Sequence, residues 1–187
     1  MLIGVLGDLG SGKTLLLAIW GYKLGFKTDK YDVYANFHIY DSNVEYLTPK
    51  KLLDINPIQK RAVVLLDEVY AWLDSRVSGS KINRILSWVV LQSRKRNMDI
   101  IYSAQIGSSA DLRLRDTTQL IVFCEAVGNP FDPDGFYYVV EWNRGIRILH
   151  RNFYLPKKVA QKYYKIYDTR EIVKPIGFEK LRKSLED

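Results

Sequence analysis

The sequence predicts an α/β fold in which a mostly parallel sheet is covered by helices on both faces. Three observations predict it. Apolar runs typical of buried parallel strands recur up to residue 125. Segments with helical periodicity lie between these runs. The first run ends at a glycine-rich turn that leads directly into a helix.

The glycine-rich turn is the most informative stretch of the chain. Residues 2–6 form an apolar strand, and residues 7–14 fit G-x-x-x-x-G-K-[ST], the phosphate-binding loop. An apolar, buried helix is expected over 13–25. The alternative is a chance match in a turn, but strand, loop and helix stand in the required order. We therefore expect this chain to bind ATP.

The residue types of the loop suit phosphate chemistry. Glycines let the backbone curl so that successive N–H groups point at phosphate oxygens. Lys13 is expected to reach the β- and γ-phosphates, where it also serves catalysis, and the Thr14 hydroxyl is expected to bind Mg²⁺. The predicted nucleotide-binding residues are Gly7, Asp8, Leu9, Gly10, Ser11, Gly12, Lys13 and Thr14.

Further elements follow from periodicity and turn signals. After residue 135 the pattern changes to a hairpin around Asn143 and Gly145, followed by a charged, helical stretch. We thus predict an ATPase domain over 1–155, which includes the hairpin near 136–153, and a helical C-terminal extension over 156–187. The expected strands are 32–39, 62–66, 99–104 and 119–124, and the expected helices are 49–54 and 83–96.

Three polar residues follow predicted strands and are expected at the carboxyl edge of the sheet, beside the phosphate-binding loop. Asp67 is the predicted second protein ligand of Mg²⁺. Glu68 is the predicted base that deprotonates an attacking water, although an acid in the first turn of a helix is the alternative. Gln105 can donate to the γ-phosphate and accept from water, which suits a sensor of hydrolysis, or it is an ordinary strand-end residue. The set favours a nucleoside triphosphate hydrolase.

Arginines that could stabilise the transferred phosphoryl group occur in two places. Arg94 and Arg96 end a predicted helix, where a solvated basic face is the alternative. Arg113 and Arg115 precede the fifth strand and are preferred, because the loop after Gln105 should lie at the functional edge.

Composition narrows the remaining choices. A net charge of +7 and a pI of about 9.3 suit a polyanionic partner without proving one. The single cysteine, Cys124, excludes an intrachain disulfide, and the two histidines lack metal-ligand spacing. No apolar stretch approaches a membrane span, and no signal peptide is recognised, so we expect a cytoplasmic protein, in the host cytoplasm if viral.

Three stretches together resemble the HerA–FtsK superfamily of DNA-translocating ATPases: residues 7–14, 65–68 and 94–105. Within it, the chain resembles viral genome-packaging ATPases and the zonula occludens toxin-like ATPases of filamentous phages, and residues 33–36 are similar to the latter. The resemblance covers residues 1 to about 125. Ser103 and Ala104 precede Gln105 where these families often show Thr-Gln.

The resemblance implies a RecA-like (ASCE) P-loop fold with strands inserted between the two Walker strands, which are the strand before the phosphate-binding loop and the strand before Asp67. It also implies a hexameric ring, an arginine acting in trans, and double-stranded DNA in a central pore. Glu68 would be the base and Gln105 the sensor. Arg76, Lys81 and Arg144, each in a predicted turn, are the expected DNA contacts, and a plain surface turn is the alternative for each.

Three functions follow from these observations. The first is a DNA-translocating motor for viral genome packaging, with a portal or capsid partner. The second is a toxin-like ATPase for virion assembly or extrusion, which acts with a membrane protein. The third is a small-molecule phosphotransferase, which the expected catalytic glutamate disfavours.

Overall fold

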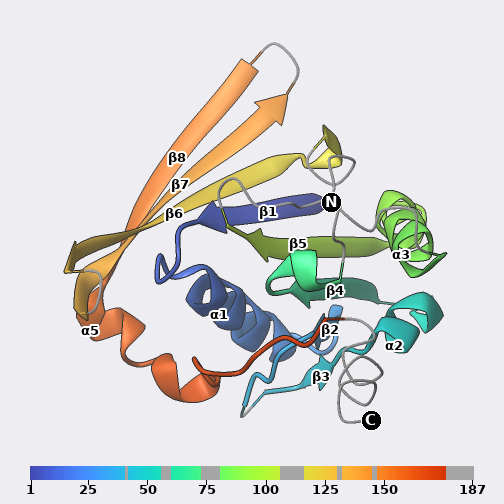
Figure 1. Cartoon of the computed structure of the whole chain (residues 1–187), viewed down its shortest axis with the longest axis horizontal. Coiled ribbons are helices and arrows are strands. Elements are labelled where there is room, and N and C mark those ends of the chain that lie inside the picture. Colours follow the sequence, from blue (N-terminus) through green and yellow to red (C-terminus); the bar gives the residue numbers. More distant parts are fainter. Residues whose placement is uncertain are drawn as a thin grey trace, which may run out of the picture.

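The computed structural model describes residues 1–40, 42–55, 60–72, 81–105, 116–129, 132–144 and 147–175. These residues form one eight-stranded sheet in the order β3-β2-β4-β5-β1-β6-β7-β8 (Figure 1). The strands are β1 Leu2–Gly7, β2 Tyr31–Ala35, β3 Val44–Tyr46, β4 Arg61–Leu66, β5 Met98–Ala104, β6 Leu120–Asn129, β7 Asp132–Arg144 and β8 Arg147–Pro156. The helices are α1 Lys13–Gly25, α2 Pro49–Asp54, α3 Lys81–Leu91 and α5 Lys157–Ala160, with 3₁₀ turns η1 Val69–Ala71 and η3 Tyr164–Ile166.

The sheet has a parallel part and an antiparallel part. Strands β1 to β6 pair in parallel, whereas β7 pairs antiparallel with both β6 and β8. Strand β1 lies in the centre, and β5 lies between it and β4. The predicted mostly parallel sheet is therefore confirmed, and the insertion between the two Walker strands, β1 and β4, is the single strand β5. Because parallel strands end at the same edge, residues after β1, β4 and β5 are neighbours there.

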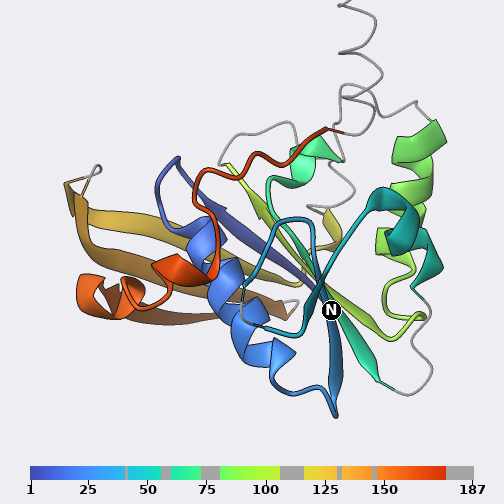
Figure 2. The ribbon, with the colours of Figure 1, turned by 90° about the horizontal axis from the view of Figure 1, so that it is seen from below.

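Helices cover both faces of the sheet, as predicted, and each face has its own core. Successive residues of a strand point to opposite faces. In β4, Val63 and Leu65 pack against α1, whereas Val64 and Leu66 pack on the side of α2 and α3. Both faces are therefore buried, which explains why β4 reads as a continuous apolar run. Figure 2 shows α1 and α3 on opposite sides of the sheet.

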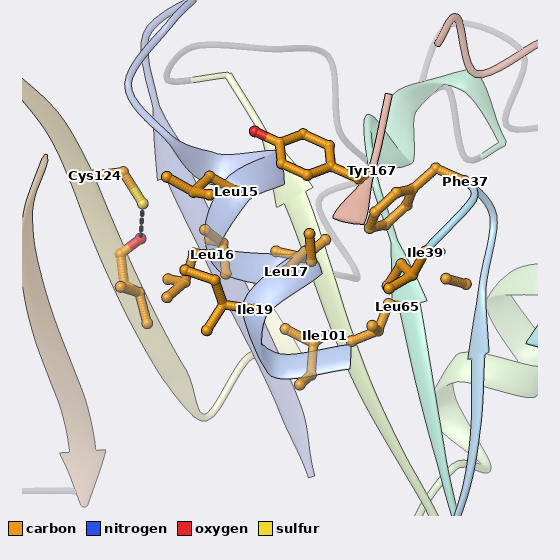
Figure 3. Close-up of a cluster of buried hydrophobic side chains, with 14 of the residues drawn as sticks. Leu15, Leu16, Leu17, Ile19, Phe37, Ile39, Leu65, Ile101, Cys124 and Tyr167 are labelled. Atoms are coloured by element: carbon orange, nitrogen blue, oxygen red, sulfur yellow. Dashed lines mark hydrogen bonds between the residues drawn. The ribbon is translucent and has the colours of Figure 1, made fainter. Parts of the chain in front are cut away.

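The core around α1 includes Leu16, Ile19 and the single cysteine (Figure 3). The Cys124 thiol is buried in β6, and its Sγ lies 3.9 Å from the Val122 carbonyl oxygen. Burial raises the pKa of this thiol to about 12. A thiol this hard to ionise is a poor nucleophile, so Cys124 acts as a small core residue, as expected.

Several predicted boundaries are wrong. The strand expected over 32–39 ends at Ala35, and β3 was not predicted because its three residues are too few to show a strand pattern. The helix expected over 83–96 ends at Leu91, and turns lead to Asn97, whose φ of 49° asparagine tolerates better than most residues. Strand β6 extends beyond 119–124 to Asn129, because it pairs with β7 along its whole length, whereas β1 pairs with it only as far as Cys124.

The predicted C-terminal extension packs into the same cores as the sheet. Between residues 157 and 175 it forms only α5 and η3, followed by chain without regular secondary structure apart from a bridge at Tyr167. Ala160, Ile166 and Tyr167 are buried in the α1 core, and Val173 is buried in the opposite core. Residues 176–187 lie outside the described part of the chain.

Candidate nucleotide-binding site

The phosphate-binding loop connects β1 to α1 and is built on two left-handed glycines. Gly10 has φ 75° and Gly12 has φ 86°. A Cβ on Gly12 would lie 2.5 Å from Phe136 Cδ1, so both conformation and space require glycine there. The Tyr138 hydroxyl donates to the Gly12 carbonyl oxygen over 3.2 Å. The hairpin strand β7 therefore supports the loop, a contact that no sequence pattern indicates.

Lys13 begins α1 and curls back into the loop. Its Nζ donates to the carbonyl oxygens of Gly7, at 3.0 Å, and Asp8, at 2.6 Å. Burial lowers the pKa of this ammonium, and the nearby Asp67 carboxylate partly opposes the shift. The loop thus holds a desolvated cation beside the N-terminus of α1, whose free N–H groups attract anions. This arrangement has the charge and the N–H donors that suit a phosphate group.

The two predicted Mg²⁺ ligands lie together. Thr14 Oγ1 donates to Asp67 Oδ2 over 2.9 Å, although the residues are far apart in sequence. A hydroxyl and a carboxylate are the oxygen ligands that Mg²⁺ prefers, and this ion usually keeps water and phosphate oxygens as its other ligands. The described residues hold no group of three or more His, Cys, Asp or Glu side chains that could bind a metal by themselves. The pair therefore fits a Mg²⁺ shared with a bound triphosphate.

The buried Asp67 is fixed from two neighbouring strands. The Asn36 side chain, beyond β2, accepts from the Asp67 backbone N–H at 2.7 Å and donates to its carbonyl oxygen at 2.9 Å. The Ser103 hydroxyl, on β5, donates to Asp67 Oδ1. Burial raises the pKa of Asp67, and the hydrogen bonds from Ser103 and Thr14 oppose that rise. Asn36 and Ser103 are thus positioning residues whose roles the sequence did not reveal.

Glu68 has the left-handed conformation, with φ 47° and ψ 56°. Such a conformation costs a non-glycine residue about 1 kcal/mol or more and is common at functional sites. It is held by the Glu68 N–H, which donates to Ser103 Oγ over 2.9 Å. The Tyr70 side chain hydrogen-bonds to the Glu68 carboxylate, and burial together with this bond raises the pKa of the phenol to about 12. The carboxylate is therefore aimed by its own backbone and by Tyr70.

Gln105 follows β5 at the same edge of the sheet. Its neighbour Ala104 pairs with Leu6 at the end of β1, and Ser103 bonds to Asp67. The side chain is partly buried and is not among the residues that line the cavity described below. The structure thus places Gln105 next to the loop, and its role as a sensor remains a prediction.

The predicted arginines and DNA contacts are mostly beyond the described part of the chain. Arg113, Arg115 and Arg76 lie outside it, as do the side chains of Lys81 and Arg144. Arg96 precedes β5, at the opposite edge of the sheet from the loop. There it donates to the carbonyl oxygens of Leu53, at 2.7 Å, and Ile55, so within this chain it caps α2.

A cavity of about 370 Å³ opens over the loop. Asp67 and Glu68 form part of its wall, together with residues 9–15 of the loop and the start of α1. The rest of the wall comes from segments that carry no recognised motif. These residues are Pro133, Phe136, Tyr164, Tyr167 and Thr169.

No protein-family model matches the chain. Two curated viral proteins, each described as uncharacterized protein ORF2, are 28% identical over 146 residues. They come from Spiroplasma virus SpV1-C74 and Spiroplasma virus SpV1-R8A2 B, and the match covers 72% of this chain and 41% of each relative. The chain therefore spans about two fifths of the length of these relatives.

Solved structures resemble the fold over most of the chain. The N-terminal domain of zonular occludens toxin from Neisseria meningitidis is 18% identical with a TM-score of 0.58, covering 89% of this chain and 98% of that domain. The genome packaging NTPase B204 of Sulfolobus turreted icosahedral virus 2, in complex with ATP-gammaS, is 12% identical with a TM-score of 0.58, covering 80% and 96%. A KaiC-like protein from Pyrococcus horikoshii OT3 is 12% identical with a TM-score of 0.52, covering 82% and 83%. The chain thus has the RecA-like fold of the P-loop NTPases.

Proposed function

We propose that this chain hydrolyses ATP with Mg²⁺ and uses the energy to move double-stranded DNA, as in viral genome packaging. One observation carries the ATPase proposal. The Thr14 hydroxyl and the Asp67 carboxylate meet at 2.9 Å beside a loop that already holds the Lys13 ammonium, and the adjacent Glu68 faces the same cavity.

Each residue has a role in this proposal. The loop N–H groups and Lys13 bind the β- and γ-phosphates and stabilise the charge that develops during phosphoryl transfer. Mg²⁺, held by Thr14 and Asp67, neutralises phosphate charge when bound. Glu68 accepts a proton from the water that attacks the γ-phosphorus, so the products are ADP and phosphate. Gln105 is proposed to orient that water.

The DNA part of the proposal is supported by the net charge of +7 and by the likeness to a packaging NTPase. The proposal includes a hexameric ring of identical chains. In this ring, Arg113 or Arg115 of one copy reaches the nucleotide-binding site of its neighbour. Arg76, Lys81 and Arg144 are the proposed contacts to the DNA backbone. A portal or capsid protein would be its partner in the host cytoplasm.

The second candidate is a toxin-like ATPase for virion assembly or extrusion, which works with a membrane protein. The specific observation in its favour is coverage: the likeness to the toxin domain includes 89% of this chain, against 80% for the packaging enzyme. Within the described residues no helix has the length and apolarity needed to cross a membrane.

The ATPase proposal is tested with Glu68→Gln, which keeps size and shape but removes the base. We expect unchanged Mg-ATP affinity and turnover reduced by about 10²-fold or more. The matched control is Glu45→Gln on the edge strand β3, where Glu45 is exposed and pairs with Lys51. Equal turnover in the two variants would refute the role of Glu68.

Duplex DNA separates the two candidates. A motor acting on DNA should hydrolyse ATP faster with duplex DNA, and binding should weaken steeply as salt rises. If no oligomer is stimulated and no salt-dependent binding occurs, the second candidate replaces the first.

A further inference from the structure

The far wall of the cavity is made by a segment with no recognised motif. After β8 and α5, the chain passes α1 and runs toward β2 (Figures 1 and 2). Two backbone contacts hold it there: the Tyr40 N–H donates to the Ile166 carbonyl oxygen over 2.7 Å, and Ile39 forms an antiparallel bridge with Tyr167. This segment brings Tyr164, Tyr167 and Thr169 to the cavity.

The two tyrosines are placed differently. Tyr167 is 7% exposed, and its ring lies over the first turn of α1 near Leu15 (Figure 3). Burial raises the pKa of its phenol, so the ring is neutral. Tyr164 is 37% exposed and stands at the rim. One ring is therefore a fixed wall, and the other is accessible to a ligand.

The chemistry of this wall differs from that of the loop. The loop side carries the Lys13 ammonium and the carboxylates of Asp67 and Glu68, which suit a metal-bound triphosphate. The other side offers aromatic rings and a proline, and among its described residues Thr169 adds a hydroxyl to the phenols. Such a surface is a poor site for phosphate oxygens, but flat heteroaromatic rings stack on it.

We propose that Tyr164 and Tyr167 form a nucleobase subsite, with Tyr164 stacking against the base of the bound nucleotide. This inference rests on the proposed nucleotide-binding function and adds the group that recognises the base. It gives the C-terminal segment a role in substrate binding. A ligand with phosphates but no base should not gain from these rings.

The test compares Mg-ATP with Mg-tripolyphosphate, which lacks the nucleoside, by calorimetry. In Tyr164→Ala we expect Mg-ATP to bind about tenfold more weakly, with tripolyphosphate affinity unchanged. Tyr164→Phe keeps the ring and should bind both ligands as the wild type does. The control is Tyr40→Ala, which removes a tyrosine ring that is 46% exposed and outside the cavity, and should alter neither affinity.

The other outcomes overturn the proposal in distinguishable ways. Unchanged Mg-ATP affinity in Tyr164→Ala would show that the ring does not contact the base. An equal loss for both ligands would show that the ring only supports the fold of the loop. If the wild type binds neither ligand, the nucleotide-binding function itself fails.

Discussion

Removing the hydroxyl of Ser103 tests how the acidic pair, Asp67 and Glu68, is held in place. This side chain is fully buried on β5, donates to Asp67 Oδ1 and accepts from the Glu68 N–H at 2.9 Å. Ser103→Ala removes both hydrogen bonds at once. The carboxylate loses a donor, and the Glu68 N–H loses the acceptor that holds it in the left-handed conformation.

The size of the effect follows from these two bonds. A hydrogen bond to a charged group contributes about 1.5–3 kcal/mol, and an unpaired buried N–H costs about 1–3 kcal/mol. Because coupled losses are not additive, we expect the free energy of unfolding to fall by about 2–4 kcal/mol. For a chain of this size, the thermal midpoint should fall by roughly 5–12 °C. Turnover should fall as well, because Glu68 is no longer fixed.

Thermal unfolding followed by circular dichroism measures the shift, and a steady-state phosphate-release assay measures turnover. The matched control is Ser87→Ala on α3, because the Ser87 hydroxyl is buried without a hydrogen-bond partner among the described residues. That variant should unfold within about 1 kcal/mol of the wild type. If Ser103→Ala unfolds like Ser87→Ala and retains full turnover, the proposal that Ser103 holds Asp67 and Glu68 in place is wrong.

Three further predictions concern named side chains. The folded state raises the pKa of Asp67 above its ordinary value of 3.8. The free energy of unfolding therefore falls as pH rises from 3.8 to the folded-state pKa, because the buried carboxyl loses its proton less readily than the unfolded one. In urea unfolding at pH 7, Asp67→Asn should therefore be as stable as the wild type or more stable by about 1 kcal/mol. The variant should nevertheless lose Mg²⁺-dependent nucleotide binding. Burial alone would raise the pKa of Asp99, but hydrogen bonds from Arg61, at 2.5 and 2.7 Å, and from the terminal ammonium lower it. Asp99→Asn should cost about 1–2 kcal/mol at pH 7, and urea unfolding should show this difference vanishing as pH falls through the lowered pKa. Tyr70→Phe removes the hydrogen bond to Glu68 and should lower kcat roughly tenfold while calorimetry finds ATP affinity unchanged; an unaltered kcat would rule out a positioning role.

The sequence was sufficient to predict structure wherever a motif depends on the local conformation of the backbone. The phosphate-binding loop needs glycines at left-handed positions and a helix directly after it, so residues 7–14 predicted both the loop and α1. The alternation of buried runs predicted a mostly parallel sheet. Parallel strands place the end of β4 near the loop, which is why the position of Asp67 beside Thr14 could be predicted from the sequence.

Residues whose roles depend on distant partners could not be predicted in this way. Asn36 and Ser103 are ordinary polar residues in sequence, and only the neighbouring positions of β2, β4 and β5 bring them to Asp67. The edge strand β3 is three residues long, too short for a pattern to appear. The hydrophobic periodicity of a strand indicates which of its residues are buried, but not which residues of other strands they contact.

The fold class, the loop and the acidic pair at the edge of the sheet can be predicted from local conformation and from the order of the strands. Both of these features can be inferred from the sequence. The completion of the cavity depends instead on packing between distant segments. Tyr138 of the hairpin supports Gly12, and the C-terminal segment supplies Tyr164 and Tyr167. These residues are more than a hundred positions from the loop along the chain. Packing against α1, the pairing of β7 with β6 and the bridge between Ile39 and Tyr167 bring them to it.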